Sequence, residues 1–340
     1  MCLPTYAFFF RCGILLSTGQ RGSLGAKGVL KIALDLLPIH FKETRETFVN
    51  GYTPFLSRRT LYGALAVSAA LLALGSFVDF PLSSALYDAS NPFAMFFAAY
   101  GAMPAPLGCV AAGTLFVCGR SRSHPVWGMV QGVGGVLLLI VGAMLVCFLP
   151  ALYLPVSPAL LAGIGLVLCI GTVLLVRRLA RGAAPASITR VALAILLVIL
   201  CELLVVNVIK VCWGRPRMRL VVNHPEAYFF PWWQWGTPLK ELLMATGVAA
   251  DEFKSFPSAH TANAATMLLL GLIPYLKPQL QRYQKALVAF GFAWTAVVAL
   301  SRIMLGAHYL TDTAVGFLIG FLSVYLLCGV IFRPHKKTKL

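Results

Sequence analysis

Long apolar stretches recur along most of this chain, and each is long enough to cross a lipid bilayer. The hydrocarbon core of a bilayer is about 30 Å thick, and about 20 apolar residues in a helix span it. The chain has 340 residues, of which 59% are hydrophobic and 11% charged. An ordinary soluble domain has about 25% charged residues. The composition therefore argues against a soluble fold, and we expect an all-α, polytopic membrane bundle.

Eight of these stretches are predicted to cross the membrane as helices. Their approximate bounds are 60–79, 93–118, 127–149, 156–176, 188–211, 260–276, 284–302 and 309–332. The chain then divides into a cytoplasmic or interfacial N-terminal segment (1–57), four N-terminal helices (58–180), a half that carries polar motifs (185–333) and a basic cytoplasmic tail (334–340).

Basic residues sit in every second loop between the predicted helices, which indicates the topology. Lys and Arg accumulate on the cytoplasmic side of membrane proteins. The basic loops and ends contain Arg58, Arg59, Arg120, Arg122, Arg177, Arg178, Arg181, Arg190, Lys277, Arg282, Lys285, Lys336, Lys337 and Lys339. The intervening loops 80–92 and 150–155 contain no Lys or Arg. Both termini are therefore predicted to be cytoplasmic, and the net charge of +17 reflects topology and contact with anionic lipids, not nucleic acid.

The long outer connection, from about 212 to 259, does not follow this rule. Its basic residues are Arg215, Arg217, Arg219, Lys240 and Lys254, and Lys210 precedes it. Its aromatic residues are Tyr228, Phe229, Phe230, Trp232, Trp233 and Trp235. The aromatic residues suit a belt at the membrane interface or a lip for an acyl chain. The cations on this side of the membrane need a separate explanation.

A first polar motif, Lys210-Val-Cys-Trp-Gly-Arg215-Pro216-Arg217, ends the fifth predicted helix. Lys supplies a mobile point charge, and Arg supplies a planar fork for two phosphate oxygens, so a pair of them suits a phosphate dianion. Basic side chains at a helix end also extend to the interface without a ligand, which is the alternative explanation.

A second motif, Phe256-Pro257-Ser258-Ala259-His260-Thr261, lies where the chain re-enters the membrane as a helix. The free N–H groups and dipole of a helix start favour an anion. Ser258 is a candidate hydrogen-bond donor to phosphate, and His260 is a candidate proton donor to a leaving oxygen. The alternatives are that Ser258 is a helix N-cap and that His260 is structural.

A third motif runs from Ser301 and Arg302 to His308 and Asp312. If a helix begins near 308, His308 and Asp312 lie on one face at i and i+4. Asp312 is then expected to hold one ring nitrogen of His308 and leave the other free to attack phosphorus. Arg302 adds a cation for the negative charge that develops on the phosphoryl oxygens.

The three motifs fall on the same, non-cytoplasmic side of the predicted topology. No set of Asp, Glu and His at metal-ligand spacing occurs elsewhere in the sequence, and most of the nine cysteines lie inside apolar stretches. We therefore expect no metal and no cofactor.

The motifs resemble those of the type 2 phosphatidic acid phosphatase (PAP2) superfamily: K-x6-R-P, P-S-G-H and S-R-x5-H-x3-D. The third motif matches at every named position. In the second, Ala259 replaces the usual Gly. In the first, Lys210 and Arg217 keep the spacing but Met218 replaces Pro, while an Arg-Pro pair occurs at Arg215. Both arginines are therefore candidates for contact with phosphate, and the spacing favours Arg217.

The resemblance implies a six-helix core and a two-step mechanism. His308 would be the nucleophile and form a phosphohistidine, Asp312 would orient it, and His260 would be the acid for the leaving group. The phosphate would be bound by Lys210, Arg217, Ser258, Arg302 and the amide of Ala259, with Arg215 as the alternative arginine. The family's substrates include phosphatidate, phosphatidylglycerol phosphate, polyprenyl pyrophosphates and lipid A phosphates. We expect a lipid phosphate, hydrolysed at the periplasmic face of a bacterial inner membrane.

Two other functions remain open from the sequence. A phosphotransferase would form the same phosphohistidine and pass the phosphoryl group to an alcohol. An anion or lipid transporter would use the outer cations for selection and Glu202, inside the fifth predicted helix, for proton relay. Glu202 could instead only form a hydrogen bond with a neighbouring helix near Asn207.

Overall fold

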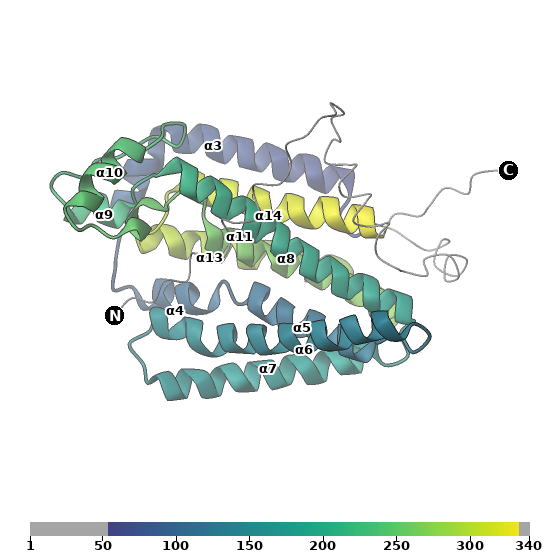
Figure 1. Cartoon of the computed structure of the whole chain (residues 1–340). Coiled ribbons are helices and arrows are strands. Elements are labelled where there is room, and N and C mark those ends of the chain that lie inside the picture. The colour runs from purple at the N-terminus through teal and green to yellow at the C-terminus, as the bar shows by residue number, and fades with distance from the viewer. Residues whose placement is uncertain (1–53, 333–340) are drawn as a thin grey trace, which may run out of the picture. The chain divides into compact units, whose positions relative to one another are not determined.

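The computed structural model describes residues 54–332, and all regular secondary structure in them is helical (Figure 1). The predicted all-α membrane bundle is confirmed. Within these residues, seven helical segments are long and apolar enough to cross a membrane. The predicted N-terminal segment 1–57, apart from its last four residues, and the basic tail 334–340 lie outside the described residues.

In residues 54–332, eight α-helices form the main part of the bundle. They are α3 (Arg58–Leu86), α4 (Pro92–Tyr100), α5 (Pro104–Cys118), α6 (Pro125–Phe148), α7 (Pro158–Ala180), α8 (Pro185–Trp213), α13 (Gln284–Met304) and α14 (Leu310–Ile331). Helices α4 to α8 each begin with proline, which suits the first helical position because its missing N–H would have no partner there.

The predicted helix 93–118 is broken in two, at Gly101–Met103. A side chain at Gly101 would lie 2.6 Å from Val298 on α13, so glycine allows α13 to approach closely here. The carbonyl of Gly101 accepts a hydrogen bond from Nε1 of Trp294 at 2.9 Å. The carbonyl at the break is therefore hydrogen-bonded, and a new helix, α5, begins at Pro104.

The predicted helix 260–276 is helical but discontinuous. It consists of α11 (Ala259–Ala265), the 3-10 helix η3 (Thr266–Leu272) and α12 (Ile273–Leu276). This segment is not among the seven in residues 54–332 that are long and apolar enough to cross a membrane, so the structure has one such segment fewer than the eight predicted. The segment packs on α13 and α14. Small residues permit this: a side chain at Gly320 would lie 2.5 Å from the carbonyl of Ala262.

The outer connection forms a small cap at one end of the bundle (Figure 1). It contains α9 (Met218–Asn223), α10 (Thr237–Ala245) and the 3-10 helix η2 (Ala250–Phe253). Its own apolar cluster consists of Leu220, Ala227, Phe230, Leu239, Leu243 and Phe253. The loops that join α5 to α6 and α7 to α8 lie at the opposite end of the bundle. The basic loops and the cap are thus at opposite ends.

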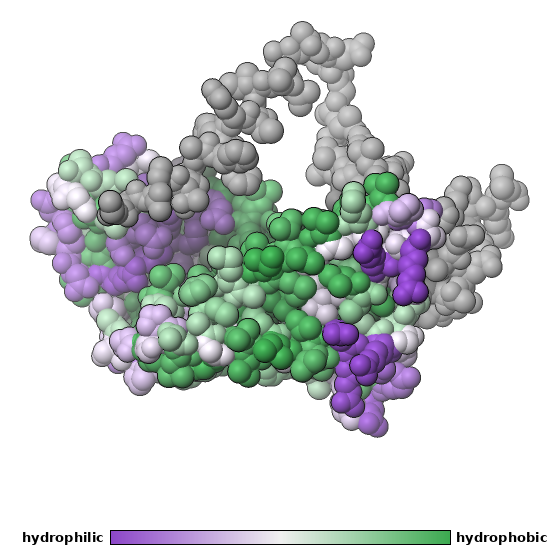
Figure 2. All heavy atoms as spheres, turned by 60° about the horizontal axis from the view of Figure 1, so that its bottom comes forward, coloured by the Kyte–Doolittle hydropathy of each residue, from purple (hydrophilic) through white to green (hydrophobic). Residues whose placement is uncertain are grey.

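Large apolar side chains cover the outside of the bundle between two hydrophilic ends (Figure 2). Helices α6 and α7 supply many of them, including Met129, Val133 and Leu137 on α6 and Val167 and Leu174 on α7, all more than one-third exposed. In water such a surface would be costly, whereas lipid is its natural environment. The protein is an integral membrane protein.

The four N-terminal helices and the motif-bearing half pack as one compact unit. Helix α3 packs on α14 and α13, and α5 packs on α8. The buried core between them includes Leu115 and Phe116 of α5, Val198 of α8 and Phe321 of α14. The predicted division at about residue 180 therefore separates the part of the sequence with the polar motifs from the part without them. It is not a boundary in the structure, because helices from both sides pack on each other.

Candidate active site

His308 lies in the short loop between α13 and α14, where it is 2% exposed. Its Nδ1 is 2.5 Å from the carbonyl oxygen of Ser255. A carbonyl only accepts hydrogen bonds, so Nδ1 carries the proton and Nε2 carries a free lone pair. Burial lowers the pKa of His308 to about 3, so the ring is neutral at physiological pH. A neutral imidazole with a free Nε2 is a competent nucleophile.

Asp312 lies within ion-pair distance of His308, as the sequence spacing predicted, but the hydrogen bond of Nδ1 goes to Ser255. Its Oδ2 is 3.7 Å from Nδ1, too far for a hydrogen bond. The reason is that α14 begins only at Leu310, so His308 precedes the helix. Asp312 instead accepts hydrogen bonds from the backbone N–H of Tyr309 at 2.8 Å and from Oγ of Ser255 at 2.5 Å. Asp312 therefore holds His308 through Ser255.

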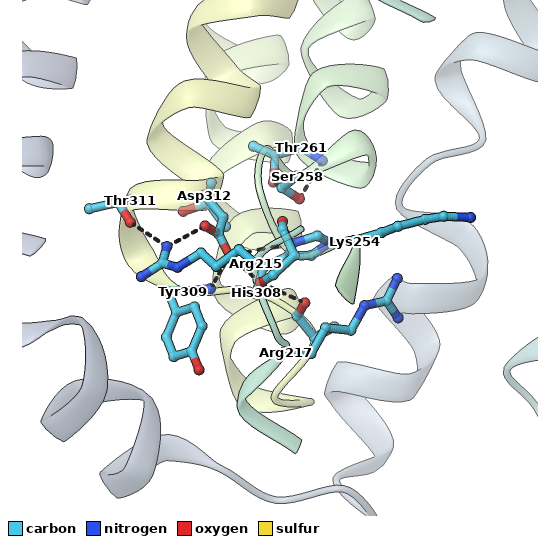
Figure 3. Close-up of polar contacts among 12 residues, drawn as sticks. Arg215, Arg217, Lys254, Ser258, Thr261, His308, Tyr309, Thr311 and Asp312 are labelled. Atoms are coloured by element: carbon cyan, nitrogen blue, oxygen red, sulfur yellow. Dashed lines mark hydrogen bonds and ion pairs between the residues drawn. The ribbon is translucent and has the colours of Figure 1, made fainter. Parts of the chain in front are cut away.

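Arg215 is fully buried beside Asp312, and most of its donors are engaged inside the protein (Figure 3). Its Nη1 donates to Asp312 at 2.5 Å and to Oγ1 of Thr311 at 2.9 Å. Its Nη2 donates to Asp79 and its Nε to the carbonyl of Phe230, both at 2.9 Å. Four of its five N–H donors are thus engaged inside the protein, which makes Arg215 the weaker of the two candidate arginines for phosphate.

Figure 3 shows Arg217 and Lys254 on the side of His308 opposite to Asp312 and the guanidinium of Arg215. Arg217 forms an ion pair with Asp251 at 2.8 Å, and its Nε is buried without a hydrogen-bond partner among the described residues. Lys210 is 7% exposed, and its Nζ donates to the carbonyl of Lys254. The structure thus distinguishes the two candidate arginines: Nε of Arg217 has no hydrogen-bond partner among the described residues, whereas every side-chain nitrogen of Arg215 makes at least one hydrogen bond.

Arg302, at the end of α13, is 2% exposed. Neither Nε nor Nη1 of Arg302 has a hydrogen-bond partner in the part of the chain that the structure describes. The guanidinium carbon lies 5.7 Å from the ring centroid of Tyr153, but a buried cation with unmade hydrogen bonds is unfavourable and is usually matched by a ligand or a counter-ion. Arg302 is therefore the clearest sign that this end of the protein receives an anion.

Ser258 and His260 lie at the start of α11. Ser258 is fully buried and caps the helix, because its Oγ accepts hydrogen bonds from the N–H and the hydroxyl of Thr261. The N-cap alternative is confirmed, and the hydroxyl proton of Ser258 is still available to a ligand. Nε2 of His260 lies 3.2 Å from the carbonyl oxygen of Ala98, and the ring packs edge-on against Tyr153, with centroids 5.5 Å apart.

The second and third motifs meet at one end of the bundle. The N–H of Ser258 donates to the carbonyl of Asp312 at 2.9 Å, and a side chain at Gly316 would lie 2.3 Å from the carbonyl of Ser258. The start of α11 therefore lies against the start of α14. The ring of Tyr153 contacts His260, with centroids 5.5 Å apart, and lies 5.7 Å from the guanidinium carbon of Arg302. The candidate site residues are Lys210, Arg217, Ser258, Ala259, His260, Arg302, His308 and Asp312.

Three residues of the site were not found from the sequence. Asp79 of α3 binds Arg215, Tyr153 lies between His260 and the guanidinium of Arg302, and Ser255 connects His308 to Asp312. Asp79 offered one signal, as an acidic residue inside an apolar stretch. Tyr153 and Ser255 offered none, since an isolated Tyr or Ser in a loop is ordinary.

Glu202 lies on α8, just over two turns from Lys210, and is fully buried. Its two carboxyl oxygens have no hydrogen-bond partner in residues 54–332. Asn207 donates instead to the carbonyl of Leu203. The alternative in which Glu202 pairs near Asn207 is therefore wrong. Within the same residues, no group of three or more His, Cys, Asp or Glu side chains could hold a metal ion.

Comparison with known proteins agrees with this geometry. Residues 191–336 match the model of the PAP2 superfamily. This match covers the part of the chain that carries the three polar motifs. A stretch of 78 residues is 35% identical to phosphatidylglycerophosphatase B of Bacillus subtilis (strain 168) and covers 22% of this chain. The chain spans 38% of the length of that relative. None of the solved structures matches this chain.

Proposed function

We propose that this protein is a membrane-embedded phosphatase that hydrolyses a lipid phosphate through a phosphohistidine at His308, without a metal. The observation that carries the proposal is Arg302, a buried guanidinium with two unpaired nitrogens at the same end of the bundle as an imidazole whose Nε2 is free. A phosphate monoester supplies both the anion that Arg302 lacks and the electrophile that His308 would attack.

Phosphate binding is assigned to the donors that the protein leaves unused. These are Arg302, Nε of Arg217, the ammonium of Lys210, the hydroxyl of Ser258 and the amide of Ala259. The transition state of phosphoryl transfer carries negative charge on three equatorial oxygens, and fixed cations and N–H groups stabilise it. Ala259 replaces the family's glycine but keeps the backbone N–H that this role needs.

In the first step, Nε2 of His308 attacks phosphorus and the bond from phosphorus to the ester oxygen breaks. His260, as the imidazolium, gives a ring proton to that oxygen and becomes neutral, so the lipid leaves as an alcohol. His308 keeps the proton on Nδ1, where the carbonyl of Ser255 holds it, and becomes a positively charged phosphohistidine. In the second step, water attacks phosphorus, the bond to Nε2 breaks, and His260 accepts the proton from water.

A lipid substrate follows from the surroundings of the site. The cap over this end of the bundle exposes Tyr228, Trp233 and Trp235, each more than half exposed, which suit the membrane interface. The relative is named as a phosphatidylglycerophosphatase. We therefore place phosphatidylglycerol phosphate first among the substrates, followed by phosphatidate, polyprenyl pyrophosphates and lipid A phosphates.

The site is assigned to the non-cytoplasmic face. Arg120 and Arg122, between α5 and α6, and Arg177 and Arg178, at the end of α7, lie at the end of the bundle away from the cap. Because basic loops stay in the cytoplasm, the cap and the site face the periplasm of a bacterial inner membrane. Both termini are then cytoplasmic.

The test is hydrolysis by purified protein in detergent with a panel of lipid phosphates, with EDTA present. The proposal predicts release of inorganic phosphate from at least one lipid, and complete loss of release in His308→Gln. Strict dependence on an added metal, or unchanged activity of His308→Gln, would contradict it. Phosphate transferred only to an added alcohol would show a phosphotransferase, and anion flux through liposomes containing His308→Gln would show a transporter.

A further inference from the structure

Asp79 is an acidic residue inside a membrane-spanning helix, and all its partners belong to the catalytic end of the protein. It lies on α3, outside the residues that match the PAP2 model, and is 2% exposed. Its Oδ1 accepts a hydrogen bond from the N–H of Thr311 at 3.0 Å. Its Oδ2 accepts from the hydroxyl of Thr311 at 2.5 Å and from Arg215 at 2.9 Å.

The end of α3 is shaped to fit the loop that carries His308. A side chain at Gly75 would lie 2.5 Å from Cγ2 of Thr311, so glycine lets the start of α14 approach α3. The N–H of Asp88 donates to the carbonyl of Met304 at 2.8 Å, just before the loop. Tyr87 packs against Gly306, where a side chain would lie 2.7 Å from the ring. Helix α3 is therefore part of the wall of the site.

Asp79, Arg215 and Asp312 form a buried charge cluster with one net negative charge. Both carboxyl groups act only as hydrogen-bond acceptors. Asp79 accepts from Thr311 and Arg215, and Asp312 accepts from Arg215, Ser255 and Tyr309. A carboxyl group that only accepts is ionised, so both carry a negative charge. Arg215 alone would neutralise Asp312, and Asp79 compensates for Arg215.

The net charge of this cluster affects the reaction at His308. The ring is neutral before the reaction and positive once the phosphohistidine forms. Oδ2 of Asp312 is 3.7 Å from Nδ1, and both side chains are almost fully buried, where charges interact more strongly than in water. A neutral Arg215–Asp312 pair would give this positive charge little stabilisation, whereas a cluster with one net negative charge favours it.

We propose that Asp79 is a positioning residue for phosphoryl transfer: it keeps the Arg215–Asp312 cluster negative and thereby stabilises the positive charge that develops on His308. The proposal rests on the proposed phosphatase function and adds a residue from a helix outside the matched part of the chain. Asp79 does not touch the substrate, so it acts on the rate of the chemical step and not on substrate binding.

The first variant is Asp79→Asn, which keeps the shape of the side chain and removes its charge. Its matched control is Ser83→Ala, one turn further along α3, where the buried hydroxyl has no partner among the described residues. We expect kcat of Asp79→Asn to fall about tenfold or more, with KM within about twofold of the wild-type value, because only the transition state is affected. Ser83→Ala should keep both values.

The double variant Asp79→Asn/Arg215→Gln separates charge from structure. It removes one negative and one positive charge, so Asp312 alone restores one net negative charge to the cluster. We expect its kcat to recover by about threefold or more relative to Asp79→Asn. If Asp79 were needed only to pack α3 on α14, the double variant would instead be worse than either single variant, since it removes more hydrogen bonds.

The outcomes distinguish this inference from the proposed function. A wild-type protein that releases no phosphate from any lipid refutes the function. An active wild type together with a fully active Asp79→Asn refutes only the role of Asp79. A change confined to KM, or a double variant that fails to fold or is no more active than Asp79→Asn, also overturns the charge argument. If Asp79→Asn alone fails to fold, the activity of the double variant against wild type decides.

Discussion

Arg302→Met should leave the ligand-free protein at least as stable as the wild type and should make the enzyme much less active. Arg302 is 2% exposed, and its Nε and Nη1 have no partners within residues 54–332. Arg302 is therefore a desolvated cation with two nitrogens that make no hydrogen bond to the described residues. Methionine has a similar volume and no charge, so Arg302→Met removes this cost and also removes two donors to the phosphoryl group.

The effects of Arg302→Met on stability and on activity differ in size and in direction. Exchanging buried ionic groups for apolar ones of similar volume is often neutral or stabilising by about 1–4 kcal/mol, so the melting temperature of the ligand-free variant should not fall. A hydrogen bond to a charged group contributes about 1.5–3 kcal/mol. Two such bonds give about 3–6 kcal/mol, which corresponds to a loss in kcat/KM of about 10²- to 10⁴-fold.

The assay combines thermal unfolding in detergent with steady-state release of phosphate. Inorganic phosphate should raise the melting temperature of the wild type and raise that of Arg302→Met much less, because ligand stabilisation depends on affinity. Arg219→Met is the matched control, since Arg219 is paired through two nitrogens with Glu252 and has no such role. An Arg302→Met variant that melts several degrees lower, or that keeps its kcat/KM, would refute the reasoning.

Three further predictions concern pH, packing and the second histidine. The folded-state pKa of His308, about 3, lies below its ordinary value of 6.5, so its neutral form contributes stability that is complete above pH 6.5 and is lost as the pH falls towards 3; the melting temperature of His308→Gln should depend less on pH in this window, and an equal dependence would contradict the burial of a neutral ring. Gly75→Ala should cost about 1–3 kcal/mol of stability and lower kcat, because the new methyl group meets Thr311 at 2.5 Å; unchanged unfolding and kinetics would show that α3 is not tightly packed there. Tyr153→Ala should lower kcat by removing the ring that packs on His260, whereas Tyr153→Phe keeps that ring and should stay close to wild type; equal loss in both variants would assign the effect to the hydroxyl.

The helices and the motif residues could be predicted from the sequence because their signals are local. Each apolar stretch reports its own length, and the spacing of Ser301, Arg302, His308 and Asp312 is specific. The discontinuity of 260–276 could not be predicted, because it depends on packing against α13 and α14, which hydropathy does not report.

The partners of the motif residues were harder to predict than the residues themselves. The i, i+4 spacing of His308 and Asp312 suggested a direct contact, but α14 begins two residues after His308 and the carbonyl of Ser255 takes its place. Arg215 and Arg217 are two residues apart in one motif, but their side chains have different partners: Asp312 for Arg215 and Asp251 for Arg217. The role of Asp79 depends on α3 lying beside α14, a contact between segments more than 200 residues apart in the sequence. Such contacts are visible only in the folded protein.

The most direct test of the central claim is to trap the covalent intermediate. Wild-type protein mixed with a lipid labelled in its terminal phosphate, and quenched in alkali within milliseconds, should carry a label that is stable in base and labile in acid. The account predicts this label on the peptide that contains His308, and its absence in His308→Gln. A label on another residue, or turnover with no labelled protein under conditions that trap the intermediate, would contradict a mechanism through His308.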